Sequence, residues 1–285
     1  MIPAEFDYVK ATSVDQAVAA LAEHGDEAKV LGGGQSLLPL LRLRLSYPTV
    51  VVDACKVDEM RGVRDEGDRI VIGSMTTHDE VLRDQLVRQH LPLLSETTQT
   101  VADPAVRHKG TFGGALAHAD PAGDLASVAV ALDATMRIAG PNGRREVAAS
   151  EFFVDYLQSV LEPDEVLVEV SLPKLGDGWG VHYEKFHRVA QAWAIVGVAA
   201  AVRRSNGSIT EARIGLTNMG STPVRARTTE EALAGVPAEA AAVRSAAQKA
   251  DDGTEPPEDL NGKADYRRHL ARVLTARAVS KAAGI

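Results

Sequence analysis

The chain has 285 residues, 45% of them hydrophobic and 25% charged, which is enough for two globular domains that each bury a core. Its net charge of −8 argues against nucleic-acid binding, because the phosphates would repel the molecule as a whole. The longest apolar stretch, residues 192–202, is about half the roughly 20 residues of a membrane-spanning helix, and the amino terminus lacks the pattern of a secretory signal.

The first fifty residues alternate between helix and strand. Ser13 and Gln16 have the spacing of a capping box, and Gly25 is a suitable stop for the helix that follows. Beyond it the pattern predicts a strand over 28–31, a helix over 37–43 and a strand over 49–53. Together these segments form a β-α-β-α-β unit with three glycines at a strand-to-helix turn.

Cys55 follows the last of these strands and is the only cysteine of the chain. No disulfide can form within the chain, which fits a reducing cytoplasm. Because an iron–sulfur cluster normally needs four thiolates, the chain cannot hold one unaided. The apolar strand before Cys55 predicts an inert, buried thiol.

A second region covers about 57–172. A hairpin is expected around residues 66–68, a helix capped by Thr77 and Glu80 follows, and another helix is expected over 91–100. A glycine-containing segment, 103–124, interrupts the regular pattern. Strands are expected over 135–139, 145–147 and 166–172. The eight histidines are scattered, and His24, His78, His90 and His269 are expected to lie on the surface.

The last region begins near residues 176–178, a glycine-rich boundary. Strands over 192–202 and 209–216 flank Asn206-Gly207, a strong hairpin signal, and the remainder is Ala-rich and helical. The sequence therefore predicts an α+β protein with a domain over 1–175, divided into subdomains of about 1–56 and 57–175, and a smaller domain over 176–285 that combines antiparallel sheet and helices.

The first glycine turn, residues 32–36, has the composition of an anion site. Three glycines let the backbone approach a phosphate and point its N–H groups at it, and the following helix adds its positive end. Ser36 adds a hydroxyl. The turn matches neither the Rossmann fingerprint nor a Walker loop. A flexible turn without a ligand is the alternative.

The second glycine turn, residues 110–115, precedes a segment with two aspartates. A second cradle of backbone N–H groups near the first would suit the two phosphates of a diphosphate. Asp120 is expected to cap a helix that starts near Ala122. Asp124 fits two interpretations equally: a hydrogen bond to the hydroxyls of a sugar or ribityl chain, or a structural role in the loop.

These two segments resemble a known family. Residues 30–39 and the pair of segments 111–114 and 120–124 are similar to the two FAD-binding motifs of the medium subunit of carbon monoxide dehydrogenase and its relatives, including the flavin domain of xanthine dehydrogenase. The order and spacing agree from end to end, with residues 165–167 and 183–186 included. The resemblance implies a two-part FAD-binding domain of the vanillyl-alcohol oxidase type, followed by the smaller carboxy-terminal domain.

The resemblance also implies which residues contact the cofactor. Those expected at the pyrophosphate are Gly32, Gly33, Gly34, Gln35, Ser36, Thr111, Phe112, Gly113, Gly114 and Ala115, with Lys29 beside them. Asp124 would lie near the ribityl or ribose hydroxyls, and Leu167, Lys185 and Trp193 near the isoalloxazine. Gln35 stands where the carbon monoxide enzymes have histidine, which weakens an assignment to that substrate.

The resemblance further implies an FAD-dependent oxidoreductase subunit with non-covalent FAD and no catalytic base or metal of its own. Electrons would come from the 2Fe-2S clusters of a small subunit, which takes them from the molybdenum cofactor of a large subunit, and would leave to an external acceptor. The implied assembly is a cytoplasmic dimer of heterotrimers, without nucleic acid or a membrane span. Lys185 would stabilise anionic reduced flavin by Coulomb attraction.

Two other functions remain open at this point. One is a self-sufficient flavoenzyme of the vanillyl-alcohol oxidase type, although no substrate-binding insert and no base beside the motifs are evident. The other is a flavin-free scaffold subunit, which the intact glycine turns disfavour. The identity of the chains that copurify and a flavin spectrum would separate the three.

Overall fold

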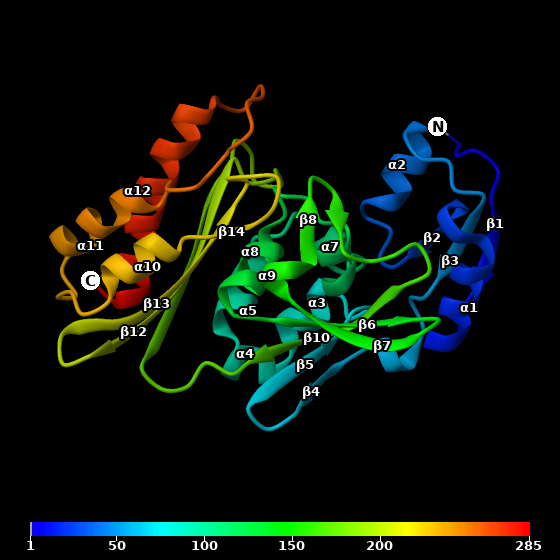
Figure 1. Cartoon of the computed structure of the whole chain (residues 1–285), viewed down its shortest axis with the longest axis horizontal. Coiled ribbons are helices and arrows are strands. Elements are labelled where there is room, and N and C mark those ends of the chain that lie inside the picture. The colour runs from blue at the N-terminus through cyan, green and yellow to red at the C-terminus, as the bar shows by residue number, and fades with distance from the viewer. Residues whose placement is uncertain (1) are drawn as a thin grey trace.

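The computed structural model describes residues 2–285, whose helices and strands form three consecutive modules (Figure 1). The amino-terminal module lies at one end of the molecule, the carboxy-terminal sheet and helices lie at the other, and the five-stranded sheet lies between them. No helix among these residues has the length and apolar character needed to cross a membrane.

The amino-terminal module is a parallel sheet of three strands in the order β1-β3-β2. Its elements are β1 (Asp7–Lys10), α1 (Val14–His24), β2 (Ala28–Leu31), α2 (Leu37–Leu43) and β3 (Val50–Asp53). Ser13 caps α1 and Gly25 ends it, as predicted. The second half of the predicted capping box is displaced by one residue, because the Gln16 side chain accepts from the amide of Thr12 rather than that of Ser13.

The central module is an antiparallel sheet in the order β4-β5-β10-β6-β7 with helices packed on it. The strands are β4 (Val63–Asp65), β5 (Arg69–Gly73), β6 (Thr135–Gly140), β7 (Gly143–Ala148) and β10 (Val166–Pro173), and β8 (Phe153–Asp155) pairs with β9 (Gln158–Ser159). The helices are α3 (His78–Arg83), α4 (Gln85–His90), α5 (Pro92–Gln99), α6 (Pro104–Arg107), α7 (Phe112–Ala117), α8 (Asp124–Ala131) and α9 (Ala149–Phe152). Thr77 and Glu80 form the predicted capping box of α3.

Two short helices correct the sequence-based expectation for 103–124. Periodicity is invisible there because α6 has only four residues and α7 contains two glycines, which are poor helix formers. Asp103 and Thr111 nevertheless cap these helices with their side chains, accepting from Val106 N and Gly114 N.

The carboxy-terminal module is an antiparallel sheet in the order β11-β12-β13-β14, covered by helices. Its elements are β11 (Trp179–Phe186), β12 (Val196–Ser205), β13 (Ser208–Thr217), β14 (Val224–Arg225), α10 (Arg227–Leu233), α11 (Ala240–Ala246) and α12 (Ala264–Ala283). Short 3-10 turns occur at Gly25–Glu27, Asp58–Met60 and Ala247–Lys249. The β12–β13 hairpin turns at Asn206-Gly207 as predicted, but β12 begins at Val196 rather than at residue 192.

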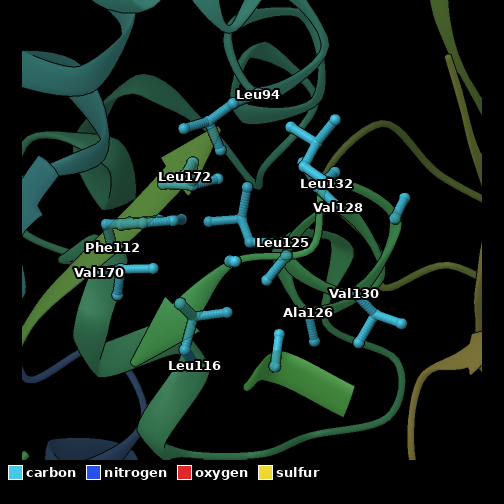
Figure 2. Close-up of a cluster of buried hydrophobic side chains, with 14 of the residues drawn as sticks. Leu94, Phe112, Leu116, Leu125, Ala126, Val128, Val130, Leu132, Val170 and Leu172 are labelled. Carbon is cyan, nitrogen blue, oxygen red and sulfur yellow. The ribbon is translucent and has the colours of Figure 1, made fainter. Parts of the chain in front are cut away.

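The main core lies where the helices of the central module pack on the five-stranded sheet. Figure 2 shows Phe112, Leu172 and other apolar side chains gathered around Leu125. Phe112 is fully buried and opens α7, whose first residues belong to the second glycine turn. The position of that turn therefore depends on the packing of a core side chain.

Replacing Phe112 with alanine is expected to lower the free energy of unfolding by about 3–5 kcal/mol, because a large buried ring is removed and a cavity remains. Chemical denaturation of the purified chain measures this change. Leu260→Ala is the matched control, since Leu260 is 99% exposed and its truncation should change the stability by less than about 0.5 kcal/mol. Equal losses in the two variants would contradict the assigned core role.

Candidate functional site

The first glycine turn presents free backbone donors. Across residues 2–285, the amide N–H groups of residues 32–36 donate to no protein acceptor. Gly34 has a left-handed φ of +72°, which a side chain would disfavour. The Gln35 side chain donates to the carbonyl oxygen of Gly33 at 3.1 Å and so braces the turn from within. The turn fits a group with several acceptor oxygens, such as a phosphate.

Cys55 supports the same turn through a hydrogen bond of its thiol. Its thiol donates to the carbonyl oxygen of Gly32, with an S···O distance of 2.9 Å. Burial, helped by the neighbouring carboxylate of Asp53, raises the pKa of the Cys55 thiol to about 12. The hydrogen-bonded thiol agrees with the expected structural role, although Cys55 is half-buried rather than fully enclosed.

The second glycine turn differs from the expectation of a matching backbone cradle. The amides of Phe112 and Gly113 donate to Thr76 O and Ser74 O, both at 2.9 Å, and the amide of Gly114 donates to the Thr111 hydroxyl. These donors are therefore already bonded within the protein. The glycine at 113 is needed for another reason, since a Cβ there would lie 2.2 Å from the Cβ of Ser74.

The two turns meet in space. A Cβ added to Gly33 would lie 1.9 Å from the carbonyl oxygen of Lys109, and one added to Gly32 would lie 3.1 Å from the Thr111 hydroxyl oxygen. Backbone therefore touches backbone between the amino-terminal and central modules. Only glycine at position 33 permits this contact.

A cavity of about 670 Å³ opens beside this contact, within the range of roughly 300–1,000 Å³ that is usual for cofactor sites. Of the residues expected at the cofactor, those in the cavity wall are Lys29, Gly32, Gly33, Gly34, Gln35, Ser36, Thr111, Gly113, Gly114, Ala115, Asp124, Leu167, Lys185 and Trp193. Phe112 is the exception: its side chain lies in the core, so it supports the site without facing it. The wall is drawn from all three modules.

Asp124 and Lys185 form a buried ion pair in this wall. Lys185 Nζ donates to Asp124 Oδ2 at 2.7 Å and to Thr100 O at 3.2 Å, and the Tyr183 hydroxyl donates to Asp124 Oδ1 at 2.7 Å. Both charged side chains are 4% exposed. The ion pair links α8 of the central module to β11 of the carboxy-terminal module.

The electrostatics of this ion pair follow from its burial. Desolvation raises the pKa of Asp124, while the charge of Lys185 and the hydrogen bond from Tyr183 oppose the shift. Burial also raises the pKa of Tyr183 well above its usual 10, so its hydroxyl stays protonated and donates. Of the two interpretations of Asp124 from sequence, this geometry favours the structural one, because each of its carboxylate oxygens already accepts a hydrogen bond.

Several wall residues were missed in the sequence, including Ser74, Met75 and His78 from the segment between β5 and α3. His78, predicted to lie on the surface, is 4% exposed, because the second glycine turn covers the start of α3 and Gly110 O accepts from His78 N at 2.9 Å. Burial, with a smaller contribution from Arg107, lowers the pKa of His78 to about 4. The Thr77 cap located the helix start but could not reveal what packs on it.

Asp120 also differs from expectation. The helix expected near Ala122 begins at Asp124 with Gly123 as its N-cap, and no side chain caps it. The Asp120 carboxylate instead accepts from the amide of Ala122 at 2.9 Å and closes a turn. This turn forms the part of the cavity wall that precedes α8.

The residues present fit FAD. A diphosphate needs several N–H donors in one place, and the first glycine turn supplies unbonded amides beside the Thr111 hydroxyl and Lys29. The wall also contains apolar residues such as Leu167 and Trp193, which suit a flat aromatic ring. Among residues 2–285, no three His, Cys, Asp or Glu side chains are grouped to hold a metal ion.

Comparison with known proteins agrees with this site. Residues 4–175 match the family model described as the FAD binding domain in molybdopterin dehydrogenase, and residues 181–282 match the CO dehydrogenase flavoprotein C-terminal domain. The carbon monoxide dehydrogenase medium chain of Hydrogenophaga pseudoflava is 40% identical, with 99% of this chain and 98% of that protein covered. The 6-hydroxypseudooxynicotine dehydrogenase complex subunit alpha of Paenarthrobacter nicotinovorans is 37% identical over 99% and 96%.

The fold agrees as closely. A solved structure of carbon monoxide dehydrogenase from Hydrogenophaga pseudoflava, which lacks the Mo-pyranopterin moiety of its cofactor, matches with a TM-score of 0.96 and 42% identity, covering 99% of this chain and 98% of that one. The similarity therefore extends through all three modules. It confirms the family resemblance and the α+β fold, in which an FAD-binding domain is followed by a flavoprotein C-terminal domain.

Gly33→Ala is expected to abolish FAD retention, because its Cβ would collide with the main chain at Lys109 and force the two turns apart. The measurement is the ratio of flavin to protein after gel filtration of the purified complex. Gly176→Ala is the matched control: a Cβ there meets nothing within 4 Å, so flavin content should equal that of the unmodified protein. Full flavin in Gly33→Ala would show that the contact between the turns is dispensable.

His78 is expected to make the protein less stable in acid. The unfolded chain binds a proton at His78 near pH 6.5, whereas the folded chain resists it until about pH 4, so stability is complete above pH 6.5 and falls as the pH drops towards 4. The loss should approach about 3 kcal/mol. Urea unfolding between pH 4 and 7 should show a smaller loss for His78→Gln, while the exposed His269→Gln should behave like the unmodified chain.

Proposed function

Because this chain belongs to the flavoprotein family of the molybdopterin dehydrogenases, we propose that it binds FAD non-covalently and relays electrons as the medium subunit of a molybdenum hydroxylase complex. The observation that carries the proposal is the meeting of the two glycine turns at one cavity, whose wall contains both the first turn, with its unbonded amides, and residues of the second. This arrangement suits a diphosphate held between two modules.

The amides of residues 32–36 and the Thr111 hydroxyl would hold the diphosphate, with Lys29 adding positive charge nearby. The remaining residues of the second glycine turn would contribute mainly shape, since the amides of Phe112 and Gly113 donate to residues 74–76 and that of Gly114 donates to the Thr111 hydroxyl. Asp124 would contact the cofactor chain only with its remaining lone pairs. Leu167, Lys185 and Trp193 would surround the isoalloxazine.

When bound, FAD supplies the redox chemistry, accepting electrons singly and releasing them singly or as a hydride. The chain contributes position and electrostatics. Asp124 and Thr100 O hold Lys185 Nζ at a fixed place in the wall, where its charge would favour an anionic ring. Such a relay needs no general base. The low pKa of His78 means that this residue of the wall adds no charge to the cavity at pH 7.

The other redox centres would lie in partner chains. A 2Fe-2S cluster normally needs four cysteine thiolates. This chain has a single cysteine, and its thiol donates a hydrogen bond to Gly32 O. A small 2Fe-2S subunit and a large molybdenum subunit are therefore proposed as partners, arranged as a dimer of heterotrimers in the cytoplasm. We place the domain boundary at 175/176, between the end of β10 at Pro173 and the start of β11 at Trp179.

The substrate would be chosen by the large subunit. Two relatives of similar identity to this chain, at 40% and 37%, carry the names of dehydrogenases for carbon monoxide and for 6-hydroxypseudooxynicotine, two unlike molecules. These names support a substrate that is chosen outside the flavin chain. Gln35, in place of the histidine of the carbon monoxide enzymes, is compatible with a substrate other than carbon monoxide.

The test is a spectrum of the complex purified from its own cells by a tag on this chain. We expect one FAD per chain, released by acid precipitation, and flavin bands that bleach when the copurified 2Fe-2S subunit is reduced. Bleaching of this chain alone by a small organic substrate would instead support a self-sufficient flavoenzyme. A complex that contains the chain but no flavin would support a scaffold subunit.

A further inference from the structure

Asn218 occupies an unusual position directly after β13. It is 7% exposed and has a left-handed φ of +63°, a conformation that few non-glycine residues adopt and that asparagine tolerates best. Such backbone strain persists where surrounding contacts fix the residue, and it often marks a functional site. Asn218 belongs to neither glycine turn and does not line the cavity.

Its two hydrogen bonds reach both sides of the cavity. The Asn218 amide N–H donates to Pro121 O at 2.8 Å, and its side-chain Nδ2 donates to Ala194 O at 2.8 Å. Pro121 lies in the turn between Asp120 and Gly123, which form one part of the wall. Ala194 directly follows Trp193, which forms another part. Asn218 thus ties the turn before α8, through its main chain, to the segment that carries Trp193, through its side chain.

The next carbonyl along the chain is held as well. Arg267 in α12, which is fully buried, donates to Ile195 O, and its guanidinium is paired with Asp259 at 2.7 Å. Residues 194 and 195 are themselves buried, whereas the side chains of Trp193 and Val189 are 57% and 65% exposed. The exposed segment 187–193 therefore ends on two buried residues whose carbonyl oxygens are hydrogen-bonded, and Asn218 links this end to the central module through Pro121.

We propose that Asn218 is a positioning residue that sets Trp193 at the edge of the cofactor cavity. Its side chain fixes the carbonyl group of Ala194, and the residue directly before Ala194 is Trp193. The anchoring of the segment is independent of any ligand, whereas its effect on a flavin ring rests on the proposed function. The two parts are therefore tested separately.

The backbone conformation and the hydrogen bonds of position 218 explain why asparagine suits it. Aspartate would place a carboxylate oxygen against Ala194 O and repel it, and alanine would keep the left-handed strain without the bond. Glycine accepts φ +63° freely and keeps the main-chain bond to Pro121. Asn218→Gly therefore removes the contact with Ala194 while leaving the backbone undisturbed.

The first experiment measures the anchoring with trypsin on the full-length chain. Arg188 is an exposed cleavage site within the segment. Loss of one hydrogen bond to a buried carbonyl should increase cleavage at Arg188 about fivefold in Asn218→Gly. Asn206→Gly is the matched control, since Asn206 is also left-handed, with φ +50°, but lies in the exposed β12–β13 turn. Equal cleavage rates in all three proteins would overturn the proposal.

The second experiment measures the consequence for flavin in the purified complex. Asn218→Gly should retain FAD but alter the fluorescence yield and reduction potential of the flavin, and Trp193→Leu should alter them in the same direction. The double variant should equal Trp193→Leu alone, because Asn218 acts through that side chain. Additive effects would refute the coupling to Trp193. A complex that holds no flavin even with the unmodified chain would refute the proposed function, while the cleavage result at Arg188 would still stand.

Discussion

The site depends on one contact, the direct approach of two stretches of main chain where a side chain would not fit. Gly33 lies against the backbone at Lys109, and Gly113 lies against Ser74. Both contacts join segments that are far apart in the sequence. Van der Waals repulsion rises so steeply that one methyl group at position 33 would force the amino-terminal and central modules apart, and one at position 113 would displace α7 from the segment after β5 within the central module. The cavity between them exists at its observed size because these two residues have no side chain.

The two glycine turns divide the work unequally. The first keeps its amides free and so provides the donors. The second provides rigidity, because the amides of Phe112 and Gly113 donate to residues 74–76 and that of Gly114 donates to the Thr111 hydroxyl. This division has a physical basis, because a donor that faces a ligand must be left without a protein partner. A turn with such unbonded amides needs support elsewhere, which Cys55 and the Gln35 side chain supply through the carbonyl oxygens of the glycines.

Much of this could be predicted from the sequence. The strands and helices of the first module, the caps at Ser13 and Thr77 and the hairpin at Asn206 follow from local patterns. The residues that the resemblance places at the cofactor all line the cavity except Phe112, but the wall also contains Ser74 and Met75, which the sequence did not indicate. The start of β12 was misjudged because Ala194 and Ile195 are apolar and buried yet not in a strand. His78 and Asn218 could not be found, since their burial depends on segments that only the tertiary fold brings near.

The carboxy-terminal domain is part of the site rather than an addition to it. A Cβ at Gly215 would lie 2.1 Å from Ser127 O, so β13 packs directly on α8, and the ion pair of Asp124 with Lys185 crosses the same interface. Separating the domains would break the ion pair between Asp124 and Lys185 and would remove Lys185 and Trp193 from the cavity wall. Because a buried charge is costly without its partner, the ion pair and the cavity form together. The geometry of the cavity and the docking of the two domains therefore depend on the same contacts, and a ligand bound in the cavity would stabilise both.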